Sequence, residues 1–177
     1  MKSLMKLNVV AMVMMGLICW GASKAQADAP KTDGEIIGLI MAIDKSEIDA
    51  AHQAEGKNIS PEVKDFAKMM EDQHGDNLAK LQALSTKTGI QPPATAGGMI
   101  MAKGDKGLAI RGVMNGHDFE KAYINDMVDG HSDALNLIDT HLLPDAQNSE
   151  LKDFVAKTRD HVVMHLAKAK ELQSKLQ

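Results

Sequence analysis

Apolar residues recur every three or four positions along four long stretches of the chain, the spacing of one face of an α-helix. The pattern predicts helices over residues 33–56, 60–88, 118–143 and 149–176. No stretch of useful length alternates apolar and polar residues as a β-strand does. The sequence therefore predicts an all-α protein. The clearest apolar face, in the last helix, consists of Leu151, Val155, Thr158, Val162, His165, Ala169, Leu172 and Leu176.

The ends of these helices carry typical boundary residues. Ser60 followed by Pro61 is a helix start, and Gly89 is a common helix stop. Pro144 predicts that the third helix ends at Leu143. Asn148 or the serine that follows it can cap the fourth helix.

The lengths of the connections predict the topology. Short connections between helices 1 and 2 and between helices 3 and 4 favour antiparallel hairpins. The connection over 89–117 is rich in glycine, and only a short helical turn is expected there, over 108–114. An extended chain covers about 3.3 Å per residue, so this connection can run the length of the bundle. We expect a four-helix bundle with a long crossover between helices 2 and 3, which makes them parallel; an up-down bundle with a long loop is the alternative.

The first residues have the features of a signal peptide. Lys2 and Lys6 precede an apolar run over 7–22, which is short for a bilayer-spanning helix. Ala25-Gln26-Ala27 is a typical cleavage site, so we expect cleavage after Ala27 and a helical-bundle domain over 28–177. An uncleaved membrane anchor is the alternative. We expect export to the periplasm or association with the outer membrane, and no transmembrane helix in the mature chain.

Charge and cysteine content exclude several functions for residues 28–177. They contain 17 basic and 24 acidic residues, a formal net charge of −7, which argues against nucleic-acid binding. The single cysteine is Cys19, so disulfides and cysteine-dependent metal or catalytic sites are excluded after cleavage. Acidic residues such as Asp44 and Glu55 are expected on solvent-exposed surfaces.

Three histidines occupy positions where an apolar residue is expected. They are His74, His131 and His165, one on each of the last three helices, and Glu47 interrupts the apolar face of the first. A buried ionisable group costs several kcal/mol unless it is paired or bound to a metal. Because inward side chains of a bundle converge on its axis, we expect these four residues to meet and to be metal ligands.

Two further residues are candidate ligands of lower rank. Glu71 forms a Glu-x-x-His spacing with His74, a motif of di-iron bundle proteins, although the full di-iron set is missing. His161 forms a His-x-x-x-His spacing with His165. Imidazole and carboxylate ligands suit iron, zinc, copper or manganese.

Two other interpretations of the same residues stay open. The histidines and Glu47 can form a hydrogen-bonded polar layer without a metal. Met70 and Met127, each four residues before a histidine, favour copper if they are ligands, although methionine also fills irregular cores. No motif of a nucleophile, phosphate-binding loop or dinucleotide site is present, so no catalytic residue is predicted and a non-enzyme is favoured.

The residues on these faces resemble the bacterial family called domain of unknown function 4142, over about 33–173. The resemblance implies an exported protein with a ferritin-like four-helix bundle, associated with the outer membrane, and implies no activity. Two functions therefore remain: metal binding for storage, buffering or oxidative-stress protection, or a non-enzymatic envelope or stress-response role with a structural polar layer. The resemblance rests on Glu47, the run Val63-Lys64-Asp65-Phe66-Ala67, Met70, His74, Asn77, Leu81, Phe119, Tyr123, Val128, His131, Leu151, Phe154, His165, Leu166 and Ala169.

Overall fold

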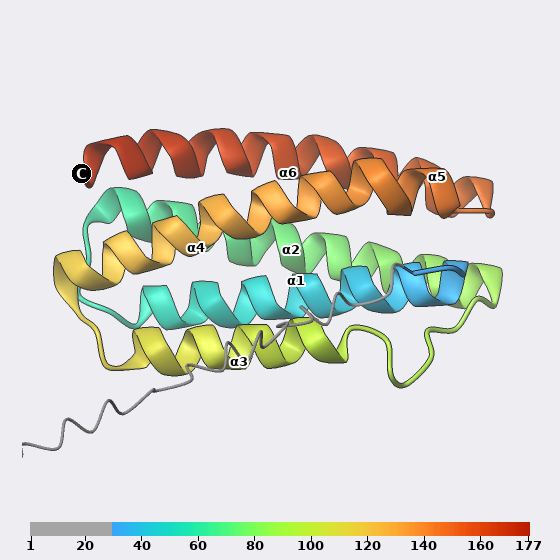
Figure 1. The fold of residues 1–177 in the computed structure, drawn as a ribbon, viewed down its shortest axis with the longest axis horizontal. Coiled ribbons are helices and arrows are strands. Elements are labelled where there is room, and N and C mark those ends of the chain that lie inside the picture. The colour runs from blue at the N-terminus through green and yellow to red at the C-terminus, as the bar shows by residue number, and fades with distance from the viewer. Residues whose placement is uncertain (1–29) are drawn as a thin grey trace, which may run out of the picture.

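The computed structural model describes residues 30–177, which form helices and loops without a β-strand (Figure 1), so the all-α prediction is confirmed. The expected signal peptide, residues 1–27, lies outside the described residues. No helix within 30–177 has both the length and the apolar character needed to cross a bilayer. The long helices are α1 (Asp33–Glu55), α2 (Pro61–Thr88), α4 (Gly116–Leu137) and α6 (Ser149–Lys175).

The helix ends follow local capping chemistry. At the start of α1 the Thr32 side chain accepts a hydrogen bond from the Glu35 backbone N–H, and the Glu35 carboxylate accepts one from the Thr32 N–H. This reciprocal pair is a capping box, which satisfies two backbone donors. The Asn148 side chain caps α6 by accepting one hydrogen bond from the Leu151 backbone N–H, without a reciprocal bond. Gly89, with φ of 73°, ends α2 in the left-handed conformation that glycine adopts without strain.

The long helices form two hairpins that lie side by side. Helix α2 follows α1 after a short loop, and α6 follows α4 in the same way (Figure 1). Helices α2 and α4 run in the same direction because the connection between them returns along the whole bundle (Figure 1). Side chains of all four long helices therefore point toward a common interior.

The crossover contains a helix that the sequence analysis did not expect. Helix α3 (Gly98–Gly112) extends well beyond the short turn expected over 108–114. Glycines allow it to lie close to α1: a Cβ on Gly97 would come 2.3 Å from the Ala42 Cβ, and a Cβ on Gly104 would come 2.2 Å from the Ser46 Oγ. The glycines that predicted an irregular loop instead let two backbones approach closely.

The end of the α4 hairpin also differs from the expectation. The helix does not stop at Leu143 but continues through a π-helical turn, η1 (Ile138–Leu142), into the short α5 (Leu143–Asp145). The Leu143 backbone N–H donates to the Ile138 carbonyl, five residues earlier. A proline ring clashes with the carbonyl four residues before it in a regular α-helix. The wider π turn gives Pro144 the space to remain within the helix.

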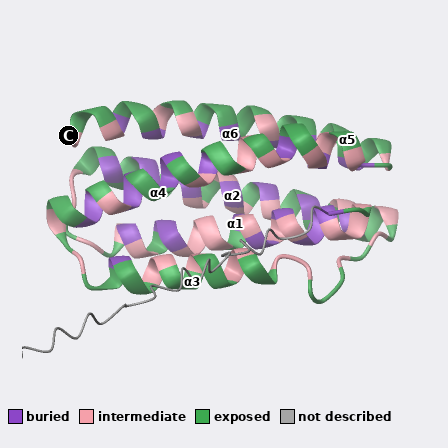
Figure 2. Ribbon diagram, viewed as in Figure 1, coloured by how far each residue is buried: buried purple, intermediate pink, exposed green. Residues whose placement is uncertain are grey.

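Buried residues lie along all four long helices (Figure 2), and the apolar ones form two clusters. One cluster includes Phe66, Met70 and Tyr123, and the other includes Ile36, Leu81 and other buried residues toward the opposite end of the bundle. On each long helix, the residues of one cluster come before a buried polar residue and the residues of the other cluster come after it. This polar layer consists of Asp44 on α1, His74 and Asn77 on α2, His131 on α4, and Thr158 and His165 on α6.

Candidate metal centre

Three histidines of the polar layer are almost completely buried. His74 is 6% exposed, His131 is 2% exposed and His165 is 1% exposed. One ring nitrogen from each lies within 4.8 Å of the corresponding nitrogens of the other two. Their ring centroids are 5.2 to 5.9 Å apart. The helix periodicity that placed the histidines on the apolar faces therefore brings them together at one depth of the bundle.

Each of these histidines uses its other ring nitrogen to donate a hydrogen bond outward. His74 Nδ1 lies 2.8 Å from Asp44 Oδ1, and His165 Nε2 lies 2.8 Å from Gln73 Oε1. His131 Nδ1 lies 2.8 Å from the Met127 carbonyl oxygen. All three partners are oxygens that accept and do not donate, so the proton of each neutral imidazole is on the outward nitrogen.

The inward nitrogens therefore carry lone pairs. These atoms are Nε2 of His74, Nε2 of His131 and Nδ1 of His165, and each is buried without a hydrogen-bond partner among residues 30–177. Three lone pairs that face one another have no proton to share, and burying them unpaired is costly. A metal ion accepts all three. Metal-ligating histidines typically donate their other N–H to a carboxylate or carbonyl, the arrangement present here.

The pKa values of the histidines follow from burial and from their neighbours. Burial lowers the pKa of His165 to about 2, with further lowering by the neighbouring histidines. Burial also lowers the pKa of His131, and Glu47 offsets only part of this. For His74, burial lowers the pKa, but the hydrogen bond to Asp44 and the charges of Glu47 and Asp44 outweigh it, so its pKa is raised.

Glu47 lies beside the histidines but outside the group of nitrogens within 4.8 Å. Its charge raises the pKa of both His74 and His131. Its Oε2 atom is buried without a hydrogen-bond partner in the described residues, as is the Tyr123 hydroxyl. Burial, and then the charge of Glu47, raise the pKa of Tyr123 well above its usual range. Glu47 therefore has a buried, unpartnered Oε2 atom and a charge that acts on two of the three histidines, His74 and His131.

Asp44 is a functional residue that the sequence analysis missed, because it was expected at the surface and is 1% exposed. One carboxylate oxygen accepts from His74, and the other accepts from Asn77 Nδ2 at 2.9 Å. Asn77 in turn accepts from the Thr158 hydroxyl at 3.0 Å. The signal was present in the sequence: Ile37 and Ala51, seven positions before and after Asp44, share its helix face and are also buried.

The two lower-ranked candidates lie apart from the three inward nitrogens. Glu71 Oε1 accepts a hydrogen bond from His52 Nε2 at 3.0 Å, near the surface between α1 and α2. This bond lowers the pKa of Glu71. His161 is exposed, and its ring centroid is 6.5 Å from that of His165.

Comparison with known proteins identifies a family but no characterised relative. The family model described as a domain of unknown function, DUF4142, matches residues 21–172. Searches of curated proteins and of solved structures give no match.

Proposed function

The chain belongs to the DUF4142 family, whose function is unknown, and we propose that it binds one transition-metal ion at the centre of a ferritin-like four-helix bundle. The observation that carries this proposal is a set of three buried histidines that bring one ring nitrogen each within 4.8 Å of one another, each histidine having one ring nitrogen without a hydrogen-bond partner in the described residues. His74, His131 and His165 are the proposed ligands. Glu47, whose Oε2 atom is buried without a partner in the described residues and whose charge acts on His74 and His131, is the proposed fourth.

The ligand set limits the class of metal. Three neutral imidazoles and one carboxylate suit Fe²⁺, Zn²⁺, Mn²⁺ or Cu²⁺ and do not suit Ca²⁺ or Mg²⁺, which prefer oxygen ligands. No methionine sulfur is needed to complete the set. Because the centre accepts one ion per chain, it suits buffering of a metal, or protection against its reactions with peroxide, better than bulk storage.

A structural polar layer is the competing proposal. In that case one proton, rather than a metal, would lie between two inward nitrogens, and the raised pKa of His74 favours this histidine as the one that carries it. This arrangement leaves at least one of the three lone pairs unsatisfied, which disfavours it as the resting state.

Metal content of protein purified without a histidine tag tests the proposal. We expect about one ion per chain, either as isolated or after incubation of apoprotein with Zn²⁺, Fe²⁺, Mn²⁺ or Cu²⁺. His74→Gln and His165→Gln should lower the affinity strongly. His141→Gln, at a half-exposed histidine that pairs with Asp145, should bind like wild type. Circular dichroism shows whether each variant is folded. Wild-type protein that stays metal-free after all four incubations would overturn the proposal.

We also propose that the protein acts outside the cytoplasm, in the periplasm or at the outer membrane. The support is the sequence of residues 1–27, with a basic start, a short apolar run and the Ala25-Gln26-Ala27 site. Cell fractionation and N-terminal sequencing of the mature protein test this. A first residue of Asp28 is expected, and full-length protein in the cytoplasm would contradict the proposal.

A further inference from the structure

The metal centre has no direct opening to solvent, so an ion must pass between helices to reach it. Between α1 and α4 the way is covered by α3, which lies against α1 through Gly97 and Gly104. Arg111 on α3 is itself buried and forms an ion pair with Asp126 on α4. Lys103 extends from α3 toward Asp133 of α4. Helix α3 therefore closes this side of the bundle.

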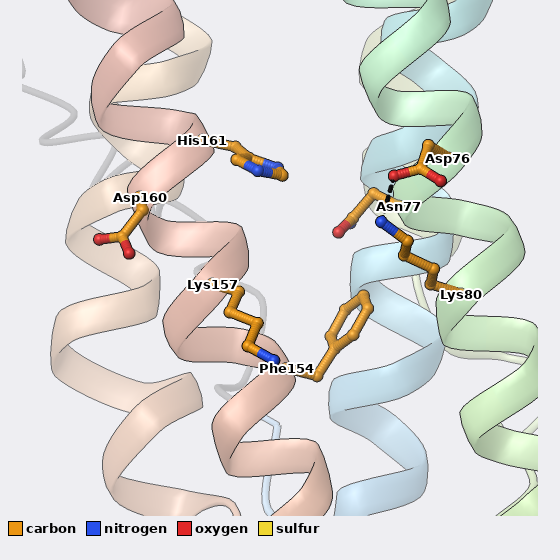
Figure 3. Close-up of a pocket in the computed structure, with 7 residues that line it drawn as sticks. All are labelled: Asp76, Asn77, Lys80, Phe154, Lys157, Asp160 and His161. Atoms are coloured by element: carbon orange, nitrogen blue, oxygen red, sulfur yellow. Dashed lines mark hydrogen bonds and ion pairs between the residues drawn. The ribbon is translucent and has the colours of Figure 1, made fainter.

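The boundary between α2 and α6 is different, because a hollow of about 230 Å³ lies there (Figure 3). In Figure 3, His161 and Phe154 project from α6 toward Asn77 on α2, while Asp160 points away from the hollow. Asn77 is 7% exposed and forms the floor of the hollow. Its amide binds Asp44, the hydrogen-bond partner of His74. The hollow therefore reaches to within two hydrogen bonds of the centre.

The hydrogen bonds that surround the three histidines are also least buried on this side. The outward hydrogen bonds of His74 and His131 are buried in the protein interior. The outward bond of His165 to Gln73 is only partly buried and runs across the boundary between α6 and α2. Gln73 and His165 each lie one helical turn from a residue that lines the hollow, Asn77 and His161 respectively. Breaking this bond would therefore free a ring nitrogen of the histidine one turn from the hollow.

His161 is placed to bind an ion before it reaches His165. It lies one helical turn before His165 on α6, and the two ring centroids are 6.5 Å apart. It forms no hydrogen bond or ion pair within residues 30–177, so its ring nitrogens are free to bind a cation. Of the two lysines that line the hollow, Lys80 is paired with Asp76, while Lys157 lies one turn before His161 on α6 and has no ion pair within residues 30–177.

We propose that the metal ion reaches the buried centre through the hollow between α2 and α6, and that His161 binds the incoming ion and passes it to His165. The inference rests on the proposed metal-binding function. It assigns His161 a role in the rate of loading and not in the final coordination. The ligand is a divalent transition-metal ion. It would replace one bound water by the His161 imidazole at the surface, and then bind the three imidazoles of the centre in the interior.

The rate of Co²⁺ uptake by apoprotein, followed by its visible absorption in a stopped-flow instrument, tests the inference. His161→Ala should slow uptake by roughly tenfold, the lower end of what a local ligand-concentrating site contributes to an association rate. The final Co²⁺ occupancy at saturation should be unchanged. His161→Asp, which keeps a cation-binding group, should restore most of the rate. His141→Ala, at a half-exposed histidine that does not line the hollow, is the control and should load like wild type.

The outcomes separate this inference from the proposed function. Uptake by His161→Ala at the wild-type rate would overturn the route and leave the metal centre intact. Reduced final occupancy in His161→Ala would show that His161 is a ligand of the bound ion, which also overturns the inference. Failure of the wild-type protein to bind Co²⁺, Zn²⁺, Fe²⁺, Mn²⁺ or Cu²⁺ would refute the proposed function itself.

Discussion

Asp44 Oδ1 accepts a hydrogen bond from His74 Nδ1 at 2.8 Å, so a carboxylate on α1 fixes which nitrogen of a histidine on α2 faces the centre. Replacement by asparagine keeps an acceptor oxygen but removes the negative charge that makes the imidazole more basic. We expect Asp44→Asn to weaken metal binding by about 10- to 100-fold, the usual effect of changing a ligand's hydrogen-bond partner. Isothermal titration with Zn²⁺ measures this.

The matched control for this substitution is Asp49→Asn on the same helix. Asp49 pairs with Lys45 at the surface and does not contact the polar layer. It should bind Zn²⁺ with wild-type affinity. Equal affinities for Asp44→Asn and wild type would show that the carboxylate serves only to fill hydrogen bonds in the layer.

The lowered pKa of His165 predicts that the apoprotein loses stability in acid. The unfolded chain protonates this histidine below about pH 6.5, whereas the folded chain does so only near pH 2. The unfolded state therefore binds more protons in this range, and the free energy of unfolding falls as the pH falls. Between pH 7.5 and 5 the loss from this group should be about 2 kcal/mol.

Urea unfolding in the presence of a chelator, with His165→Gln as the comparison, measures this loss. The variant lacks the titrating group, so its stability should fall less steeply with acid than that of wild type. The raised pKa of His74 acts in the opposite direction, since its protonation favours the fold, and this contribution remains in both proteins. Parallel curves for the two proteins would mean that folding does not suppress protonation of His165.

Gly38 allows the crossover to lie against α1. A Cβ at this position would come 2.3 Å from the Ala96 Cβ and 3.0 Å from the Pro92 Cβ, neither of which can rotate away. We expect Gly38→Ala to destabilise the protein by about 1–3 kcal/mol through this overlap. Gly75→Ala on α2 has open space around it and should be neutral or stabilising by up to about 1 kcal/mol. The midpoints of urea unfolding compare the two variants. Equal stabilities would show that the crossover can move away from α1 at no cost.

Asp33 connects the start of α1 to the loop before α6. Its two carboxylate oxygens accept from the backbone N–H groups of Gln147 and Asn148, at 2.8 and 2.9 Å. Removing them in Asp33→Ala should cost about 1–2 kcal/mol, since both bonds are charge-assisted but near the surface. Asp118→Ala, also in the first turn of a helix, is the control for the helix dipole and should cost less than 1 kcal/mol. Thermal unfolding distinguishes them.

The spacing of apolar residues was sufficient to predict the buried residues of a helix that has one buried face. All seven buried residues of α6, including Thr158 and His165, are on the face that the sequence predicts. Helix α1 was harder because it packs against α2 on one side and α3 on another. Glu47 was expected inside and is only partly buried, while Asp44, expected at the surface, is buried. A helix enclosed on two sides has no single apolar stripe that marks its face.

The candidate centre was predictable in its histidines and less so in its surroundings. His74, His131 and His165 stand out because each replaces an apolar residue at a core position. The hydrogen bonds that orient them come from Asp44, Gln73 and a backbone carbonyl. The seven-residue spacing from Ile37 and Ala51 indicates that Asp44 is buried, but no spacing identifies any of the three acceptors as a partner of a histidine. Helix α3 was missed because its glycines lower its intrinsic helix propensity. Their role is to allow close packing against α1, which the sequence alone does not reveal.

The hydrogen bonds of the polar layer join residues that are far apart along the chain, and this has a kinetic consequence. They link positions 30, 81 and 92 residues apart, from helices in both hairpins. Long-range contacts form late in folding because the loops between them must close first. A partly folded chain therefore brings together at most His74 and His131 until the last helix docks. If the protein binds a metal as proposed, the complete set of ligands exists only in the folded protein, so a folding intermediate would not hold the ion.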